Sequence, residues 1–216
     1  WHQKMAKEAD LYLSGEEGIK DRYKEIGVKH YYFQMDVCDG DIPIYAKYNK
    51  KIDVLFTGSC IGQGHRKEWL QIINKKIPIK IYSWNYEEWK KLGFDAYPAV
   101  YGIQYNELIA DSKIVLGFSV EPYCFGYWSN RIGKVLRVGG FLLQEYAPGM
   151  EQFLPINSTD FFSSPEEAIE KIKFWLAQEQ IPRESTTFNW TSQYKVEQLS
   201  VLIERYLKGD YKKWLM

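Results

Sequence analysis

The stretch Ile52-Asp-Val-Leu-Phe-Thr-Gly-Ser-Cys60 begins as a short apolar run and stops at a glycine. A run of this length, bounded by a turn residue, is typical of a buried β-strand, which we place at 52–57. Apolar positions then recur with helical spacing over 66–74, and a second apolar run follows at 77–83. Strand, helix and strand in this order predict two parallel strands joined by a crossover.

The same alternation of helices and strands continues towards the C-terminus. Ser164, Pro165 and Glu167 form a helix start, as cap, first helical residue and capping-box acid. The fold class we expect is therefore α/β, with a Rossmann-like doubly wound parallel sheet. The predicted helices are 86–92, 105–112 with Asn106 as its cap, 129–138 ending at Gly139-Gly140, 165–179 and 193–207, and the predicted strands are 113–118 and 141–143.

Upstream of Ile52, a separate strand–helix–strand unit is predicted. It consists of a strand at 10–14, a helix at 16–26 that ends at Gly27, and a strand at 29–34. The segment 36–51 carries glycine and proline and no clear periodicity, so we interpret it as a connector and a candidate domain boundary.

Charge and composition exclude some classes of function. Lysine plus arginine number 28 and aspartate plus glutamate also number 28, so the chain lacks the basic footprint of a nucleic-acid binder. No stretch reaches the ~20 apolar residues of a membrane-spanning helix, so we expect no membrane span. Cys38, Cys60 and Cys124 have neither metal-ligand nor redox spacing. Reduced thiols predict a cytoplasmic location.

Two segments are candidates for anion binding, because ligands of open parallel sheets bind beyond the carboxyl ends of the strands. In the first, Gly58 and Ser59 follow a strand and Arg66 opens a helix. Glycines let a phosphate approach the backbone, and the arginine neutralises its charge. The spacing matches neither a Walker loop nor a dinucleotide fingerprint, so a plain strand-to-helix turn is the alternative.

The second segment opens the helix 129–138. Ser129 and Asn130 stand at its start, where they can cap the helix and donate to an anion. Arg131 and Lys134 are one turn apart and therefore lie on one face. The alternative is that this face is merely solvated.

The run Ser129-Asn-Arg-Ile-Gly-Lys-Val-Leu-Arg-Val-Gly-Gly-Phe-Leu-Leu143, with Pro148-Gly-Met-Glu151 after it, resembles the donor-binding region of group 1 family glycosyltransferases. The likeness is to the branch that contains spore-maturation-type proteins. Segments 105–116 and 161–176 are similar to the elements that flank this region in the family. The resemblance covers roughly residues 53–180.

The resemblance implies a GT-B glycosyltransferase, in which two Rossmann-like domains face a cleft. The chain would then supply mainly the C-terminal half, which binds a nucleotide-sugar donor, while the acceptor, whether glycan, protein or small molecule, stays unknown. Because the resemblance makes the N-terminal residues only the tail of the other half, we expect most of an acceptor domain to be absent from this chain, and the lack of an initiator Met agrees with a fragment. The resemblance assigns 1–50 to the tail of the N-terminal domain and its linker, 51–190 to the donor domain, and 191–216 to a helix that packs back.

Site residues follow from the resemblance position by position. Lys134 stands where many relatives carry a glutamate that holds the donor ribose, and Gly126 stands where the paired acid is expected. A lysine cannot accept two hydroxyl protons as a carboxylate does, so it either binds phosphate or has lost the role. The resemblance places Gly58 and Ser59 in the first phosphate-facing loop, Ser129, Asn130 and Arg131 at the diphosphate-facing helix start, and Tyr101 and Tyr105 beside the base.

This reading implies a metal-independent transfer without cofactor, in which Arg66, Arg131 and Lys134 stabilise the leaving diphosphate. A catalytically inactive domain that binds a nucleotide or a partner is the alternative. An NAD-dependent oxidoreductase fits less well, because the first loop lacks the required glycine spacing. No catalytic residue is assigned. His65 is a further candidate, and Glu121 and Glu145, near strand ends, either contact sugar hydroxyls or are solvated.

Overall fold

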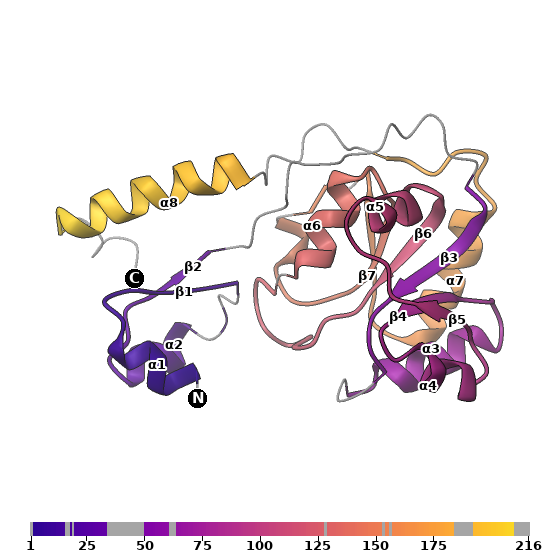
Figure 1. The fold of residues 1–216 in the computed structure, drawn as a ribbon, viewed down its shortest axis with the longest axis horizontal. Helices are drawn as coiled ribbons and strands as arrows, with labels where there is room; N and C mark the ends of the chain where they lie inside the picture. Colours follow the sequence, from indigo (N-terminus) through magenta and orange to yellow (C-terminus); the bar gives the residue numbers. More distant parts are fainter. Residues whose placement is uncertain are drawn as a thin grey trace.

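A computed structural model describes residues 2–15, 18, 20–33, 50–60, 64–127, 129–152, 154–155, 157–183 and 192–209. Its centre is a six-stranded, wholly parallel sheet in the order β5-β4-β3-β6-β7-β8 (Figure 1). The order steps outward from β3 to β5 and then returns beside β3 to continue the other way, as in a Rossmann fold. The predicted fold class is confirmed. The strands are β3 (Ile52–Thr57), β4 (Lys80–Ser83), β5 (Asp95–Pro98), β6 (Ser112–Gly117), β7 (Leu142–Glu145) and β8 (Thr159–Phe162).

Helices cover both faces of this sheet. Helices α3, α4 and α7 pack on one face, and α5 and α6 pack on the other. Burial on both faces explains why the central strands β3 and β6 are near-continuous apolar runs rather than alternating ones. The helices are α3 (Arg66–Asn74), α4 (Tyr86–Lys91), α5 (Gly102–Ala110), α6 (Asn130–Arg137) and α7 (Pro165–Leu176), with a short 3₁₀ helix, η3 (Met150–Gln152), between β7 and β8.

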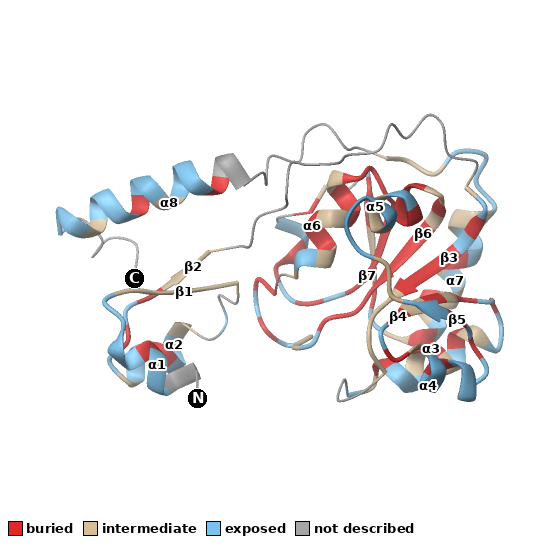
Figure 2. Cartoon of the chain, viewed as in Figure 1, coloured by how far each residue is buried: buried red, intermediate tan, exposed pale blue. Residues whose placement is uncertain are grey.

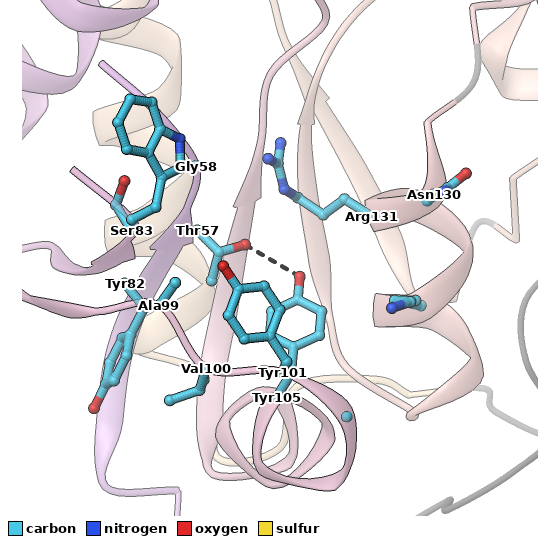
Figure 3. Close-up of a pocket in the computed structure, with 13 residues that line it drawn as sticks. Thr57, Gly58, Tyr82, Ser83, Ala99, Val100, Tyr101, Tyr105, Asn130 and Arg131 are labelled. Carbon is cyan, nitrogen blue, oxygen red and sulfur yellow. Dashed lines mark hydrogen bonds between the residues drawn. The ribbon is translucent and has the colours of Figure 1, made fainter. Parts of the chain in front are cut away.

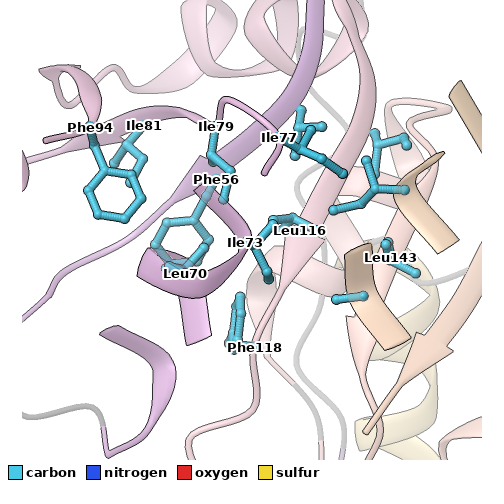
Figure 4. Packing of buried hydrophobic residues seen from close by; sticks show 14 of the residues in the cluster. Phe56, Leu70, Ile73, Ile77, Ile79, Ile81, Phe94, Leu116, Phe118 and Leu143 are labelled. Carbon is cyan, nitrogen blue, oxygen red and sulfur yellow. The ribbon is translucent and has the colours of Figure 1, made fainter. Parts of the chain in front are cut away.

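Successive residues of β3 build the two cores. Val54 and Phe56 pack towards α3 and α4, whereas Leu55 packs towards α5 and α6. All three side chains are buried, and Figure 2 shows the sheet as a buried layer between its helices. In the first core, the Phe56 ring stands nearly perpendicular to the rings of Trp89 and Phe118, with centroids 6.0 and 5.7 Å away. Figure 4 shows Phe56 and Phe118 in this cluster. These aromatic contacts hold the carboxyl end of β3, from which the site begins.

A smaller body lies beside the sheet and contains both ends of the described chain (Figure 1). Its two strands pair in parallel, as predicted, and Tyr23 stacks on His30 at 5.3 Å. The C-terminal helix α8 contacts this body, since Lys29 Nζ donates to the Tyr206 hydroxyl at 3.1 Å. The elements are α1 (His2–Glu8), β1 (Tyr12–Ser14), α2 (Lys20–Glu25), β2 (His30–Tyr32) and α8 (Ser192–Leu207).

Several elements differ from the sequence predictions. Helix α1 and strands β5 and β8 were not predicted. Helix α5 begins at Gly102 with Tyr101 at its N-cap, so the assignment of Asn106 as the cap was wrong. Helix α5 is anchored by its buried residues Leu108 to Ala110 near the C-terminal end. It extends from there towards the N-terminus, where its first turn is exposed. Asn106 therefore lies inside the helix, a position where asparagine lowers helix stability only slightly.

The start of α7 matches its sequence signature closely. The Ser164 hydroxyl accepts the Glu167 N–H at 3.1 Å, and Pro165 occupies the first turn. The Glu167 carboxylate accepts the Ser163 N–H at 2.7 Å, one residue before the position that a capping box uses.

Replacing Ser164 with alanine removes this cap, so we expect Ser164→Ala to lower the free energy of unfolding by about 1 kcal/mol. Ser163→Ala is the matched control, because Ser163 contributes only its backbone N–H. Urea unfolding measures both values. Equal losses for the two variants would contradict the assignment of Ser164 as the cap.

Candidate donor site

A cavity of about 310 Å³ lies at the carboxyl ends of β3, β4 and β5, where the first turns of α5 and α6 close it (Figure 3). The position follows from the topology. The chain leaves β3 for one face of the sheet and β6 for the other, and the crevice between such strands binds ligands. The lining residues are Thr57, Gly58, Tyr82, Ser83, Trp84, Ala99, Val100, Tyr101, Gly102, Tyr105, Asn130, Arg131 and Lys134.

The cavity brings together most of the sequence-predicted donor residues. Gly58, Tyr101, Tyr105, Asn130, Arg131 and Lys134 line it, whereas Ser59, Arg66 and Ser129 do not. The contributions of β4 and of the segment after β5 were not predicted from the sequence. No local signal marks these residues, because only parallel alignment of the strand ends brings them to the cavity.

Gly58 sits where the backbone leaves β3, and its geometry excludes a side chain. Its φ is +153°, and a Cβ there would lie 2.9 Å from the Phe56 ring and 3.0 Å from Arg131 Nη2. The Gly58 N–H donates to the Tyr82 carbonyl at 3.2 Å, and its carbonyl accepts the Trp89 indole N–H at 3.0 Å. The backbone is thus fixed close to the Arg131 guanidinium.

Tyrosines of α5 form the opposite wall. The Tyr105 hydroxyl pairs with Thr57 Oγ1 at 3.1 Å, which ties α5 to the end of β3 (Figure 3). The Lys134 ammonium lies 5.6 Å from the centre of the Tyr105 ring, within cation–π range. Tyr101 is 73% exposed, so its ring is accessible for stacking on a planar group.

Helix α6 presents its N-terminus to the cavity. Ser129 is the N-cap in extended conformation, but its side chain makes no capping bond. The first-turn N–H groups of a helix lack intrahelical partners and carry partial positive charge, which suits an anion. Arg131 and Lys134, one turn apart and half-buried, face the cavity from this helix.

Two guanidinium groups share the Phe56 ring. The Arg131 and Arg66 guanidinium carbons lie 5.4 and 5.8 Å from its centre. Arg66 is buried, and its Nε–H has no hydrogen-bond partner in the described part of the chain. Burial, and then the nearby Arg131 charge, lower the pKa of Arg66 to about 10. Arg66 therefore remains charged at neutral pH, at a cost that a bound anion would offset.

A buried carboxylate pairs with a half-buried imidazole at the start of α3, next to Arg66. Glu145 Oε1 is 2.5 Å from His65 Nε2, and Oε2 accepts the Ser119 N–H at 2.9 Å. Burial raises the pKa of Glu145, against the opposing effects of His65 and of the Ser119 hydrogen bond. Glu145 is thus buried and paired rather than solvated, and it fixes the imidazole that precedes α3.

The model of the glycosyl transferase-like family matches residues 65–187, more than half of the chain. The chain belongs to this family. Solved structures show the same fold. A sucrose-phosphate synthase from Thermosynechococcus elongatus matches with a TM-score of 0.66 at 8% identity, over 96% of this chain and 61% of its own. A glycosyltransferase involved in avilamycin A biosynthesis matches with 0.62 at 13% identity, over 91% and 64%.

A third glycosyltransferase-fold match is HepE from Anabaena in complex with UDP-glucose, with a TM-score of 0.57 at 14% identity, over 93% of this chain and 68% of its own. This chain spans less than two thirds of the length of the sucrose-phosphate synthase and of the avilamycin glycosyltransferase. Comparison with curated proteins gives no match. Within the described residues, no helix has the length and apolar character needed to cross a membrane.

The geometry at Gly58 generates a stability prediction. We expect Gly58→Ala to lower the free energy of unfolding by about 1–3 kcal/mol more than Gly93→Ala, because only at Gly58 does the new methyl group overlap neighbouring side chains. Gly93 also has a positive φ, of +86°, but open space where its Cβ would lie. The pair thus separates steric overlap from backbone strain. Chemical denaturation measures both, and equal losses would refute a tight packing at Gly58.

Proposed function

We propose that this chain is the donor-binding part of a metal-independent glycosyltransferase, with the nucleotide-sugar held in the cavity between β3, α5 and α6. The observation that carries the proposal is the pair of guanidinium groups on Phe56. Among the described residues, neither Arg66 nor Arg131 forms a direct salt bridge, and the carboxylate whose charge acts on Arg66 is Glu145, which is already paired with His65. Two adjacent cations that outnumber the nearby carboxylate favour a dianionic group such as a diphosphate.

The cavity also has walls suited to the rest of such a ligand. With the diphosphate at the N-terminus of α6, the nucleoside extends along the helix towards Lys134 and the exposed Tyr101 ring. Tyrosine faces stack on bases, and the apolar Val100 lines the same side. The fold match to HepE, a protein solved with UDP-glucose, supports a nucleotide-sugar as the ligand class.

In the proposed chemistry, the bond between the sugar carbon and the diphosphate oxygen breaks as the oxygen of an acceptor hydroxyl bonds to that carbon. The hydroxyl proton passes to the departing diphosphate or to solvent. Negative charge grows on the leaving diphosphate, and fixed cations stabilise it without reorganisation. Arg66, Arg131 and the start of α6 supply this charge, which is the task that a metal performs in other transferases. The acceptor is an unidentified glycan, protein or small molecule.

The proposal extends to the arrangement of the chain. Residues 51–190 form the donor domain, of the spore-maturation-type branch, while 1–50 and 191–216 belong with an N-terminal acceptor domain. Contacts between α8 and the small body support this division. Lys195 Nζ lies 5.1 Å from the centre of the Phe33 ring, and Lys29 bonds to Tyr206.

A second candidate function is nucleotide binding without turnover. It is favoured by the lining of the cavity, because Lys134 stands on α6 and none of the lining residues in the described part of the chain carries a carboxylate to accept the ribose hydroxyl protons. Hydrolysis and transfer assays with a panel of nucleotide-sugars distinguish the two functions, because only a transferase releases nucleoside diphosphate.

The charge on Arg131 should dominate diphosphate binding. We expect Arg131→Ala to weaken binding of UDP or GDP about 10- to 150-fold, since a charge-assisted hydrogen bond is worth about 1.5–3 kcal/mol. Lys113→Ala is the control, because it removes one positive charge at the amino end of the central strand β6, whereas the cavity lies at the carboxyl ends of the strands. Calorimetric titration measures the dissociation constants. An unchanged constant for Arg131→Ala would exclude its proposed role.

Metal independence is tested by chelation. We expect UDP or GDP to bind with the same dissociation constant in buffer with EDTA and in buffer with added Mg²⁺, because protein cations already neutralise the diphosphate. Loss of binding in EDTA, restored by Mg²⁺, would show that a divalent cation belongs to the site.

A further inference from the structure

The turn that leads into α6 is held by the small body. Two consecutive carbonyls of this turn accept hydrogen bonds from residues more than ninety positions earlier. The Gly18 N–H donates to the Phe125 carbonyl at 3.0 Å, and the Tyr32 hydroxyl donates to the Gly126 carbonyl at 2.9 Å. Gly18 lies between β1 and α2, and Tyr32 ends β2, so both donors belong to the small body.

The approach at Gly18 is too close for any side chain. A Cβ on Gly18 would lie 2.8 Å from the Phe125 nitrogen and 2.9 Å from Cys124 Sγ. The first of these atoms is backbone and cannot rotate away, so alanine at this position forces the two segments apart. The contact between the small body and the turn is therefore a specific, fitted one.

The turn is also held from its other side. The Gly126 N–H donates to the Pro148 carbonyl at 2.9 Å, and the Phe125 ring lies so close to Gly149 that a Cβ there would be 2.5 Å away. Gly126 adopts a φ of +69°, and the next residue, Tyr127, is buried in the core with Ile132 of α6. If this turn moves, the buried Tyr127 moves with it and displaces Ile132, and with it the first turn of α6.

We propose that Gly18 and Tyr32 are positioning residues for the N-terminus of α6, so that the small body sets the place of Arg131 in the donor site. The place of the small body and ligand affinity at the donor site are then coupled, because a movement of the small body away from the turn also loosens the diphosphate site. The positioning itself is present in the free chain. Only the ligand affinity that follows from it rests on the proposed function.

The test uses the full chain with Tyr32→Phe, and with Tyr31→Phe as the matched control. Tyr31 is the preceding residue of the same strand, so its side chain is directed to the opposite face. On that face burial raises the Tyr31 pKa, and the Arg205 charge of α8 acts in the opposite direction. Hydrogen exchange of residues 124–133 in the ligand-free chain gives the first readout. Titration with inorganic pyrophosphate and with UDP gives the second.

We expect Tyr32→Phe to accelerate exchange in 124–133 about fivefold and to weaken pyrophosphate and UDP binding about two- to tenfold, the effect of losing one hydrogen bond. Tyr31→Phe should leave both unchanged. Gly18→Ala should accelerate the same exchange. In this second variant the new methyl group overlaps the turn, whereas Tyr32→Phe removes a hydrogen bond to it.

The results separate the positioning role from the proposed function and from the effect on ligand affinity. Unchanged exchange in both Tyr32→Phe and Gly18→Ala, or equal acceleration in Tyr31→Phe, overturns the positioning role. Faster exchange in Tyr32→Phe and Gly18→Ala alone supports it even if the unaltered chain binds neither pyrophosphate nor UDP, and that absence of binding would count against the proposed function instead. Faster exchange with unchanged affinity overturns the coupling to the donor site.

Discussion

The pairing of β3 with β6 is the constraint on which the rest of this structure depends. The two strands lie side by side in parallel, from Ile52 beside Ser112 to Phe56 beside Leu116. Their chains then diverge to opposite faces of the sheet, which leaves a crevice that no crossover covers. Gly58 emerges on one side of this crevice and α6 on the other. Without that pairing, neither the cavity nor the approach of Arg131 to Gly58 would exist.

The sequence predicted the parts of the fold in which periodicity is strong. Strand β3 and helix α3 have the predicted bounds, because the apolar run of β3 stops just before Gly58 and the apolar positions of α3 recur with helical spacing. Strand β5, Asp95–Pro98, was missed because it is an edge strand in which only Ala96 is buried. Strand β8 was missed because it carries a polar Thr-Asp start, of which Asp160 pairs with Lys171 of α7.

The candidate site was predictable only where function leaves a local mark. Glycine after a strand and arginine at a helix start are such marks, and the structure does place Gly58 and Arg131 together. His65 and Glu145 are eighty positions apart in the sequence, so no local pattern predicts their pairing. The same holds for Tyr32 and Gly126, which meet across two separate bodies. Such contacts depend on tertiary packing, which periodicity does not encode.

The crowding around Gly58 also bears on how this chain can change over evolutionary time. The space that a Cβ would need is shared between the Phe56 ring and the Arg131 guanidinium. A substitution at any one of these positions therefore alters what the other two tolerate. A smaller residue at 56 or 131 would make room at 58, but the φ of +153° would still strain any side chain placed there. Gly58 is therefore the position of the three that no change at the other two releases.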